Sequence, residues 1–479
     1  MADSIQPSTP SETTAEKKPL KLNYKRTFII GFAFFGILML WQVYNTYCPS
    51  MLTELLKTAM GTTDSTQVQY IVGIIMAMDN VAALFMLPIF GHLSDKTKTP
   101  IGKRMPYIIG GTIIAAAVFP FIPLCFHWNS LAGVIVTMAI VLFFMMMYRN
   151  PAVALMPDIT PKPLRSRANG IINLVGYIGA ICAGGLAIFL KFTTYMSTKN
   201  VWVIETPFLV ASGLMLVTAA VLFFKIKENK IEEEMEPEMR RGEEMAATEE
   251  KVVDEGPMPK KNLIMLILIL TAEFLWFFSF NAIETFGQNY GIYYLGCESS
   301  KMSTATIILT ICSLVTFIPA GYLADKIGRK WTIVIGLSII IGLLLWGCFI
   351  KPTGITYDVT VDGVTTTYQK FPWAFYLIFG GCGIGWAMVN CCSFPMVVEL
   401  CSSKKIGRFT GYYYAASMAA QSLTPIVMGL IFKVTGAYWV MPIYSCTAMA
   451  AALIVFLFVK NVRAKKVQNK KGLEGLDQD

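Results

Sequence analysis

The chain has 479 residues, of which 55% are hydrophobic and 15% are charged, and it carries a formal net charge of +9. Because soluble proteins are roughly a quarter charged, this composition nearly excludes an ordinary globular enzyme. The 11 cysteines and two histidines form no CxxC pair or histidine-assisted ligand set, which argues against a zinc site or a disulfide scaffold. We therefore expect no metal and no other cofactor.

Apolar segments recur along the whole chain. Each is about 20 residues long, which is enough for a helix to cross roughly 30 Å of hydrocarbon. They predict an all-α membrane protein with twelve transmembrane helices. The expected spans are residues 28–48, 67–90, 107–126, 131–149, 169–190, 205–224, 262–286, 302–323, 331–350, 373–398, 409–432 and 437–459.

Residues 225–261 form the only long charged segment, and they divide the spans into two halves of six, residues 28–224 and 262–459. We interpret this segment as a solvated linker that can be partly helical. Residues 1–27 and 460–479 are then polar tails. The first tail has no short apolar stretch followed by a cleavage site, so we expect the first span to act as an uncleaved insertion signal.

The basic residues are distributed unevenly between alternate loops. With the N-terminus inside, the cytoplasmic segments hold 33 of the 40 Lys and Arg residues and the outer segments hold 7. This asymmetry predicts that both termini and the linker face the cytoplasm. The net positive charge follows from topology and from attraction to anionic headgroups, so no nucleic-acid partner is expected. We expect a multi-pass protein of the plasma membrane, functioning as a monomer.

A repeated motif supports the division into halves. Related sequences follow the second and the eighth span, and each leads to a glycine and two cations. The first copy is Gly91-His-Leu-Ser-Asp95-Lys96 with Gly102-Lys103-Arg104, and the second is Gly321-Tyr-Leu-Ala-Asp325-Lys326 with Gly328-Arg329-Lys330. Two copies at equivalent turns indicate an internal repeat.

These paired motifs and the twelve spans resemble the major facilitator superfamily. Within it, the stretches 94–106 and 154–170 are similar to the glycoside-pentoside-hexuronide:cation symporters and to plant-type sucrose carriers. Melibiose-type carriers place a carboxylate before the Pro-x-x-Gly of the second span, whereas Leu87 precedes Pro88 here, so a sodium site like theirs is not expected. The resemblance implies uptake of a sugar or glycoside.

Two carboxylates stand at midplane depth. Asp79 lies 12 residues before Gly91, and Glu273 lies 12 residues after Lys261. An aspartate at a helix centre costs roughly 2.5–3.5 kcal/mol on insertion, so such residues usually face a cavity and serve a function. All Lys and Arg residues can be placed in loops or at helix ends, so no cation is expected beside them. We predict that Asp79 is the principal proton-coupling residue and that Glu273 is its partner; the alternative is a neutral carboxyl that only ties helices together.

Polar and aromatic side chains at helical spacing are candidates for the wall of a central cavity, because lipid cannot satisfy amides or hydroxyls. Their alternative role is hydrogen bonding between helices. The predicted substrate-binding residues are Gln42, Asn45, Asn173, Tyr177, Asn281, Glu284, Trp386, Asn390, Tyr413 and Gln421.

Charged residues near the cytoplasmic helix ends are expected to form an inner gate, as the superfamily resemblance implies; the alternative is simple interfacial anchoring. The expected gate residues are Gly91, Asp95, Lys103, Arg104, Arg149, Asp158, Gly321, Asp325, Arg329, Lys330 and Glu399.

Together these features predict a secondary transporter that takes up a sugar or glycoside with protons by alternating access. One alternative is an exporter of amphipathic or cationic small molecules, which the unpaired carboxylates and many aromatics favour. Another is a nutrient sensor that keeps the fold without turnover. An enzyme is not expected, because no nucleophile and base stand in a recognisable pattern.

Overall fold

The computed structural model describes residues 20–189, 201–250, 260–361, 364–398, 400 and 406–460. Within these ranges, twelve helical segments are long and apolar enough to cross a membrane, which confirms the predicted fold class. The helices of the first half are α1 (Tyr24–Met60), α2 (Gln69–Lys96), α3 (Met105–Val118), α4 (Phe121–His127), α5 (Leu131–Asp158), α6 (Arg165–Phe189) and α8 (Val201–Lys225). Those of the second half are α10 (Lys260–Asn289), α11 (Ser299–Ile327), α12 (Arg329–Cys348), α13 (Ala374–Val398), α14 (Ile406–Thr435) and α15 (Val440–Leu457).

Further elements connect these helices. The linker contains helix α9 (Glu228–Glu250), and a hairpin of β1 (Thr356–Val361) and β2 (Val364–Gln369) follows α12. Two short 3-10 helices, η1 (Ser65–Val68) and η2 (Lys162–Leu164), and a π-helical turn, η3 (Tyr290–Tyr294), complete the described elements.

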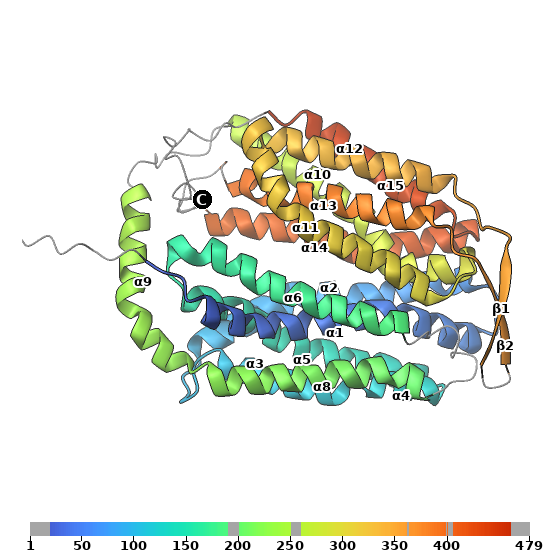
Figure 1. Ribbon diagram of the computed structural model, residues 1–479, viewed down its shortest axis with the longest axis horizontal. Helices are drawn as coiled ribbons and strands as arrows, with labels where there is room; N and C mark the ends of the chain where they lie inside the picture. The colour runs from blue at the N-terminus through green and yellow to red at the C-terminus, as the bar shows by residue number, and fades with distance from the viewer. Residues whose placement is uncertain are drawn as a thin grey trace, which may run out of the picture.

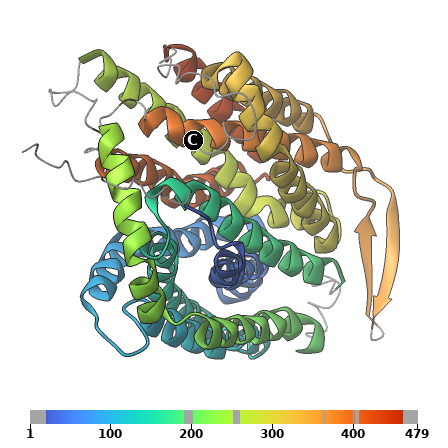
Figure 2. The ribbon, with the colours of Figure 1, turned by 60° about the vertical axis from the view of Figure 1, so that its left-hand side comes forward.

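The two halves lie side by side as two bundles (Figures 1 and 2). Helix α9 lies at one end of the molecule, where α1 begins, and the hairpin lies at the other (Figure 1). We call these the linker end and the hairpin end. In the predicted topology, the linker end faces the cytoplasm.

Prolines inside the helices made the boundaries hard to place from sequence. The first span was expected to end at residue 48, but α1 continues through Pro49 to Met60. The fourth was expected to end at Arg149, yet α5 continues through Pro151 to Asp158. Proline is tolerated within membrane helices because neighbouring groups satisfy the carbonyl that loses its partner. The third span does break, between α3 and α4 at Pro120.

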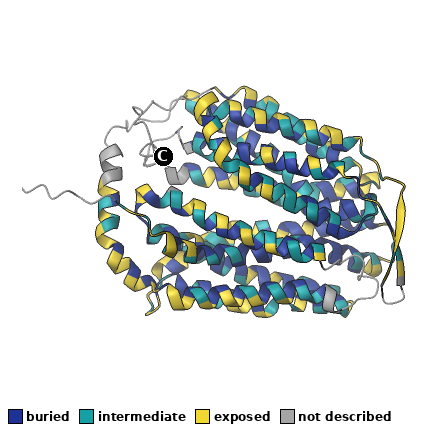
Figure 3. Cartoon of the chain, in the orientation of Figure 1, coloured by how far each residue is buried: buried dark blue, intermediate teal, exposed yellow. Residues whose placement is uncertain are grey.

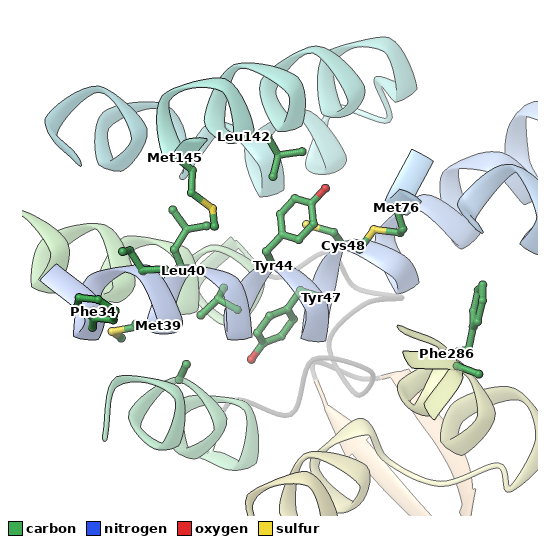
Figure 4. Packing of buried hydrophobic residues seen from close by; sticks show 14 of the residues in the cluster. Phe34, Met39, Leu40, Tyr44, Tyr47, Cys48, Met76, Leu142, Met145 and Phe286 are labelled. Carbon is green, nitrogen blue, oxygen red and sulfur yellow. The ribbon is translucent and has the colours of Figure 1, made fainter. Parts of the chain in front are cut away.

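The core of the first half forms around α1. Figure 4 shows Leu40 and Tyr44 of α1 pointing towards Leu142 and Met145 of α5, and all four side chains are buried. The outward faces of both bundles are exposed over much of their length (Figure 3). Many large apolar side chains on the membrane-spanning helices are exposed, as expected for helices in lipid.

The halves touch closely along α2 and α14. Gly73 of α2 lies so near the backbone of Pro425 in α14 that a Cβ atom on the glycine would overlap the proline carbonyl. A Cβ atom on Gly429 of α14 would likewise overlap the backbone carbonyl of Gln69. Two glycines on opposite halves therefore permit this close approach towards the hairpin end.

Candidate functional site: a polar cavity between the halves

A small cavity lies between the two halves. Two helices of each half supply its walls, and most of the lining side chains are polar. The lining residues are Trp41, Asn45, Met76, Asp79, Asn80, Asn281, Glu284, Thr285, Gln421 and Pro425. Amides, carboxylates and one indole thus gather at a single place within the membrane-spanning region.

Asp79 sits in the middle of α2 and is only 2% exposed. Its Oδ1 atom accepts hydrogen bonds from the backbone amide of Asn80 (2.5 Å) and from the Asn80 side-chain amide (2.9 Å). The charges of Arg149 and Glu284 both lie within electrostatic range of this carboxylate. Asp79 therefore faces a cation from its own half and a second carboxylate from the other half.

Arg149 is placed differently from the sequence-based expectation. We expected it at a cytoplasmic helix end, but it lies inside α5, nine residues before the helix ends at Asp158. Its Cζ atom lies 5.7 Å from the centroid of the Trp41 ring, a cation–π arrangement. The expectation that no cation stands beside Asp79 is therefore wrong. The reason is that α5 continues through Pro151 instead of ending before it, so Arg149 lies within the helix.

Glu284, not Glu273, lines the cavity together with Asp79. Tyr177 of α6 lies within electrostatic range of Glu284. Glu273 is fully buried elsewhere in α10, near Tyr413 and Tyr414 of α14, and neither of its carboxylate oxygens has a hydrogen-bond partner among the described residues. Asp79 and Glu273, both predicted to lie at midplane depth, are thus in different surroundings.

Five predicted residues line the cavity: Asn45, Asp79, Asn281, Glu284 and Gln421. Several others are engaged outside that lining by hydrogen bonds within their own helix or half. Gln42 donates to Thr46, Asn173 donates to the carbonyl of Asn169, Asn390 donates to the carbonyl of Trp386, and Tyr413 shares a hydrogen bond with Ser393.

Trp386 packs within the second half rather than against the cavity. Its indole stacks on the ring of Phe280, with 3.9 Å between centroids and 6° between planes, and meets Phe277 edge-on. The aromatic ring that lines the cavity is Trp41. Both tryptophans stand near an amide one helical turn away, so spacing alone could not distinguish them.

The first repeat motif forms an ion cluster at the linker end. Arg104 pairs with Asp95, and its Nε atom donates to Asp158 at 2.9 Å. Lys103 lies 3.5 Å from the same Asp158 carboxylate. Burial lowers the pKa of Arg104, but Asp158 and Asp95 raise it more, so the guanidinium stays charged. A Cβ at Gly91 would displace the side-chain amide of Asn150, which donates to the carbonyl of Leu87 at 2.6 Å.

The second repeat motif is arranged differently. Asp325 is exposed near the end of α11, and Gly321 has open space around it. Lys330 donates to the carbonyl of Leu457 in α15 (2.9 Å). Arg329 begins α12, and Glu399 lies outside the described residues.

A polar network joins the two halves at the hairpin end. Asn289 of α10 accepts from Ser50 (3.0 Å) and donates to Thr53 (3.2 Å) and Gln69 (3.1 Å). Gln69 also donates to the hydroxyl of Tyr438 (2.8 Å). We call these five residues the hairpin-end network. It was not predicted, because the first predicted span ends at residue 48 and the seventh at residue 286, before Ser50, Thr53 and Asn289.

A second contact closes the same end. The hydroxyl of Tyr293 donates to the carboxylate of Glu54 at 2.6 Å, and Lys57 lies over the Tyr293 ring. Lys433 likewise lies 3.8 Å from the centroid of Tyr70. Buried polar bonds and charge contacts thus hold the halves together at the hairpin end.

Two six-helix halves around a shared polar cavity define a membrane transporter. The chain belongs to the Major Facilitator Superfamily, whose model matches residues 30–356 and 292–476. The finer branch suggested by the sequence remains a prediction.

Solved transporters share the fold. A D-xylose-proton symporter has 16% sequence identity and a TM-score of 0.64, covering 93% of this chain and 100% of that one. The xylose transporter XylE from E. coli, in a partially occluded inward open conformation, has 14% identity and a TM-score of 0.63 over 93% of this chain and 100% of that one. A "Probable L-galactonate transporter" from Escherichia coli (strain K12) is 23% identical over 142 residues, 30% of this chain and 27% of that protein.

Proposed function

We propose that the chain is a proton-coupled transporter that takes up a sugar or glycoside by alternating access. The observation that carries this proposal is the pairing of Asp79 and Glu284 from opposite halves within a cavity rich in amides. Amides and carboxylates offer directional partners to hydroxyl groups, and the Trp41 indole offers a face for the apolar side of a sugar ring. The similar fold of a D-xylose-proton symporter is in keeping with this chemistry.

Proton coupling follows from the charges around Asp79. With Asp79 and Glu284 both ionised, the Asp79 carboxylate attracts Arg149 in its own half and repels Glu284 in the other half. A proton on Asp79 removes both interactions at once. Binding of a proton therefore changes the relative energies of the access states, which is the differential interaction that coupling requires. In this proposal Glu284 takes the partner role first given to Glu273.

Alternating access depends on polar contacts at the two ends of the molecule. The hairpin-end network closes one side of the cavity through hydrogen bonds between the halves. We infer that these bonds break when the halves rock to open that side. The Arg104 cluster lies at the opposite end and within the first half, so it controls the inner gate by positioning the ends of α2 and α5.

The test uses purified protein in liposomes with an imposed pH gradient. Uptake of radiolabelled sucrose, melibiose and D-xylose is compared with uptake of tetraphenylphosphonium, a lipophilic cation. We expect gradient-dependent accumulation of at least one sugar, abolished by a protonophore. Accumulation of the cation alone, or export driven by protons, would support the exporter instead. Binding of a sugar with no transport or exchange would support the sensor.

A further inference from the structure

The linker helix α9 is docked on the first half. The side-chain amide of Asn229 donates to the carbonyl oxygens of Thr99 (2.9 Å) and Pro100 (3.1 Å), in the loop between α2 and α3. In the same loop, Lys103 Nζ lies 3.0 Å from Glu232. The start of this helix therefore binds the loop that carries the first repeat motif, through hydrogen bonds and an ion pair.

Further along α9, apolar and small residues continue the docking. Ile231 and Met235 are buried, and Met235 accepts a hydrogen bond from Arg26 at the start of α1 (3.1 Å). Gly242 packs against Pro161 and Pro163 in the loop before α6. The linker thus contacts three separate segments at the same end of the first half.

Glu228, the first residue of α9, is the most deeply placed residue of this contact. It is 1% exposed, and its carboxylate accepts hydrogen bonds from the backbone amides of Arg104 (3.0 and 3.1 Å) and Met105 (3.0 Å). The first amides of a helix have no partner within that helix. Arg104 supplies no side-chain cap for α3. Glu228 therefore does for α3 what an acidic N-cap does, although it comes from more than a hundred residues away.

The loop is shaped around this carboxylate. Gly102 has φ of +121°, a region that residues with a Cβ rarely adopt. A Cβ atom at Gly102 would overlap the carboxylate of Glu228. Glycine at position 102 of the repeat motif therefore leaves the space that the Glu228 carboxylate occupies.

Arg104 connects the linker to the inner gate. Its backbone amide is held by Glu228, while its side chain pairs with Asp95 at the end of α2 and with Asp158 at the end of α5. We propose that Glu228 is a positioning residue that sets the inner-gate cluster: it holds residues 97–104 so that Arg104 bridges Asp95 and Asp158. The consequence for transport rests on the proposed function, but the positioning itself does not.

The first experiment measures docking without any substrate. Purified full-length protein is treated with trypsin, and cleavage after Lys230 and Arg240 is followed by mass spectrometry. We expect Glu228→Ala to speed cleavage at least tenfold and Glu228→Gln to speed it less, because the amide oxygen still accepts hydrogen bonds. Glu233→Gln is the matched control, since Glu233 is an exposed carboxylate on the same helix. Equal rates in all four proteins, at equal thermal stability, would overturn the proposal.

The second experiment asks whether Glu228 acts through Arg104. The reporter is Thr285→Cys in the cavity lining, and its alkylation by a maleimide added from the linker side is followed by mass spectrometry. We expect Glu228→Ala to change the rate severalfold in the native chain and to have no added effect when Arg104→Gln is present. Equal effects in both backgrounds would show that Glu228 does not act through Arg104. Neither assay needs transport, so failure of the proposed function is detected separately.

Discussion

Arg149 of α5 lies over the indole of Trp41 in α1, 5.7 Å from the ring centroid, and its charge also acts on Asp79 of α2. Three helices of the first half therefore meet around one guanidinium at the wall of the cavity. A planar guanidinium can stack on an indole and hydrogen-bond at its edge at the same time, which a lysine ammonium cannot do. This relationship links the carboxylate proposed to bind protons with the aromatic surface proposed to bind sugar.

Replacing Asp79 should separate transport from exchange. In Asp79→Asn the side chain keeps its size but can no longer lose a proton, so it stays in one charge state. We expect proton-driven accumulation to fall at least tenfold while exchange of labelled for unlabelled sugar persists, measured in liposomes. Wild-type accumulation with unchanged pH dependence in this variant would remove Asp79 from the coupling mechanism.

Glu284 and Glu273 provide a matched pair on the same helix. Glu284 lines the cavity, whereas Glu273 is buried away from it near Tyr413. We therefore expect Glu284→Gln to lower accumulation strongly and Glu273→Gln to leave accumulation within twofold of wild type. The measurement is the steady-state accumulation ratio under a fixed pH gradient. The reverse order would restore the original assignment of Glu273 as the partner of Asp79.

Trp41 lines the cavity and Trp386 does not, so we expect their replacement to affect sugar uptake differently. Trp41→Ala removes the cavity's indole, and we expect the KM for sugar uptake to rise about 2- to 10-fold, because an aromatic contact is worth roughly 0.5–1.5 kcal/mol. Trp386→Ala removes a ring stacked at 3.9 Å on Phe280. Its main effect should be a lower melting temperature, with KM nearly unchanged. A larger KM effect at Trp386 would contradict the cavity described above.

The fold could be predicted from sequence because long apolar segments and basic loops report directly on the membrane. The twelve spans depend only on hydropathy and length, so an error of a few residues at a boundary does not change their number. The hairpin was missed because it carries no such signal, although the Asp362-Gly363 pair between β-branched residues is typical of a two-residue turn.

The cavity was predicted only in part, because the depth of a residue does not give its direction. Asp79 and Glu273 have equal depth, yet only Asp79 lines the cavity. Which face of a helix meets the other half depends on packing between helices distant in sequence. The position of Arg149 depended on whether Pro151 ends a helix, and that is decided by tertiary contacts rather than by local propensity.

The hairpin-end network provides a test of gating. Asn289→Ala removes the side chain that bonds Ser50, Thr53 and Gln69 across the halves. Each hydrogen bond between membrane helices contributes about 0.6–2 kcal/mol, so the population open at the hairpin end should rise about 3- to 30-fold for each bond lost. We expect faster labelling of Thr285→Cys by an impermeant maleimide added from the hairpin side. Slower or unchanged labelling would show that these bonds do not close that end.

Steric bulk at the close contact of α2 and α14 should also favour the state that is open at the hairpin end. A methyl group on Gly73 would overlap the carbonyl of Pro425, and backbone atoms cannot give way as a flexible side chain can. Gly73→Ala should therefore disfavour the state closed at the hairpin end and speed labelling of the cavity from that side. Gly213→Ala on α8 is the control, because a Cβ there meets open space. If Gly73→Ala instead left labelling and melting temperature equal to those of Gly213→Ala, the close approach of the two halves at this point would be wrong.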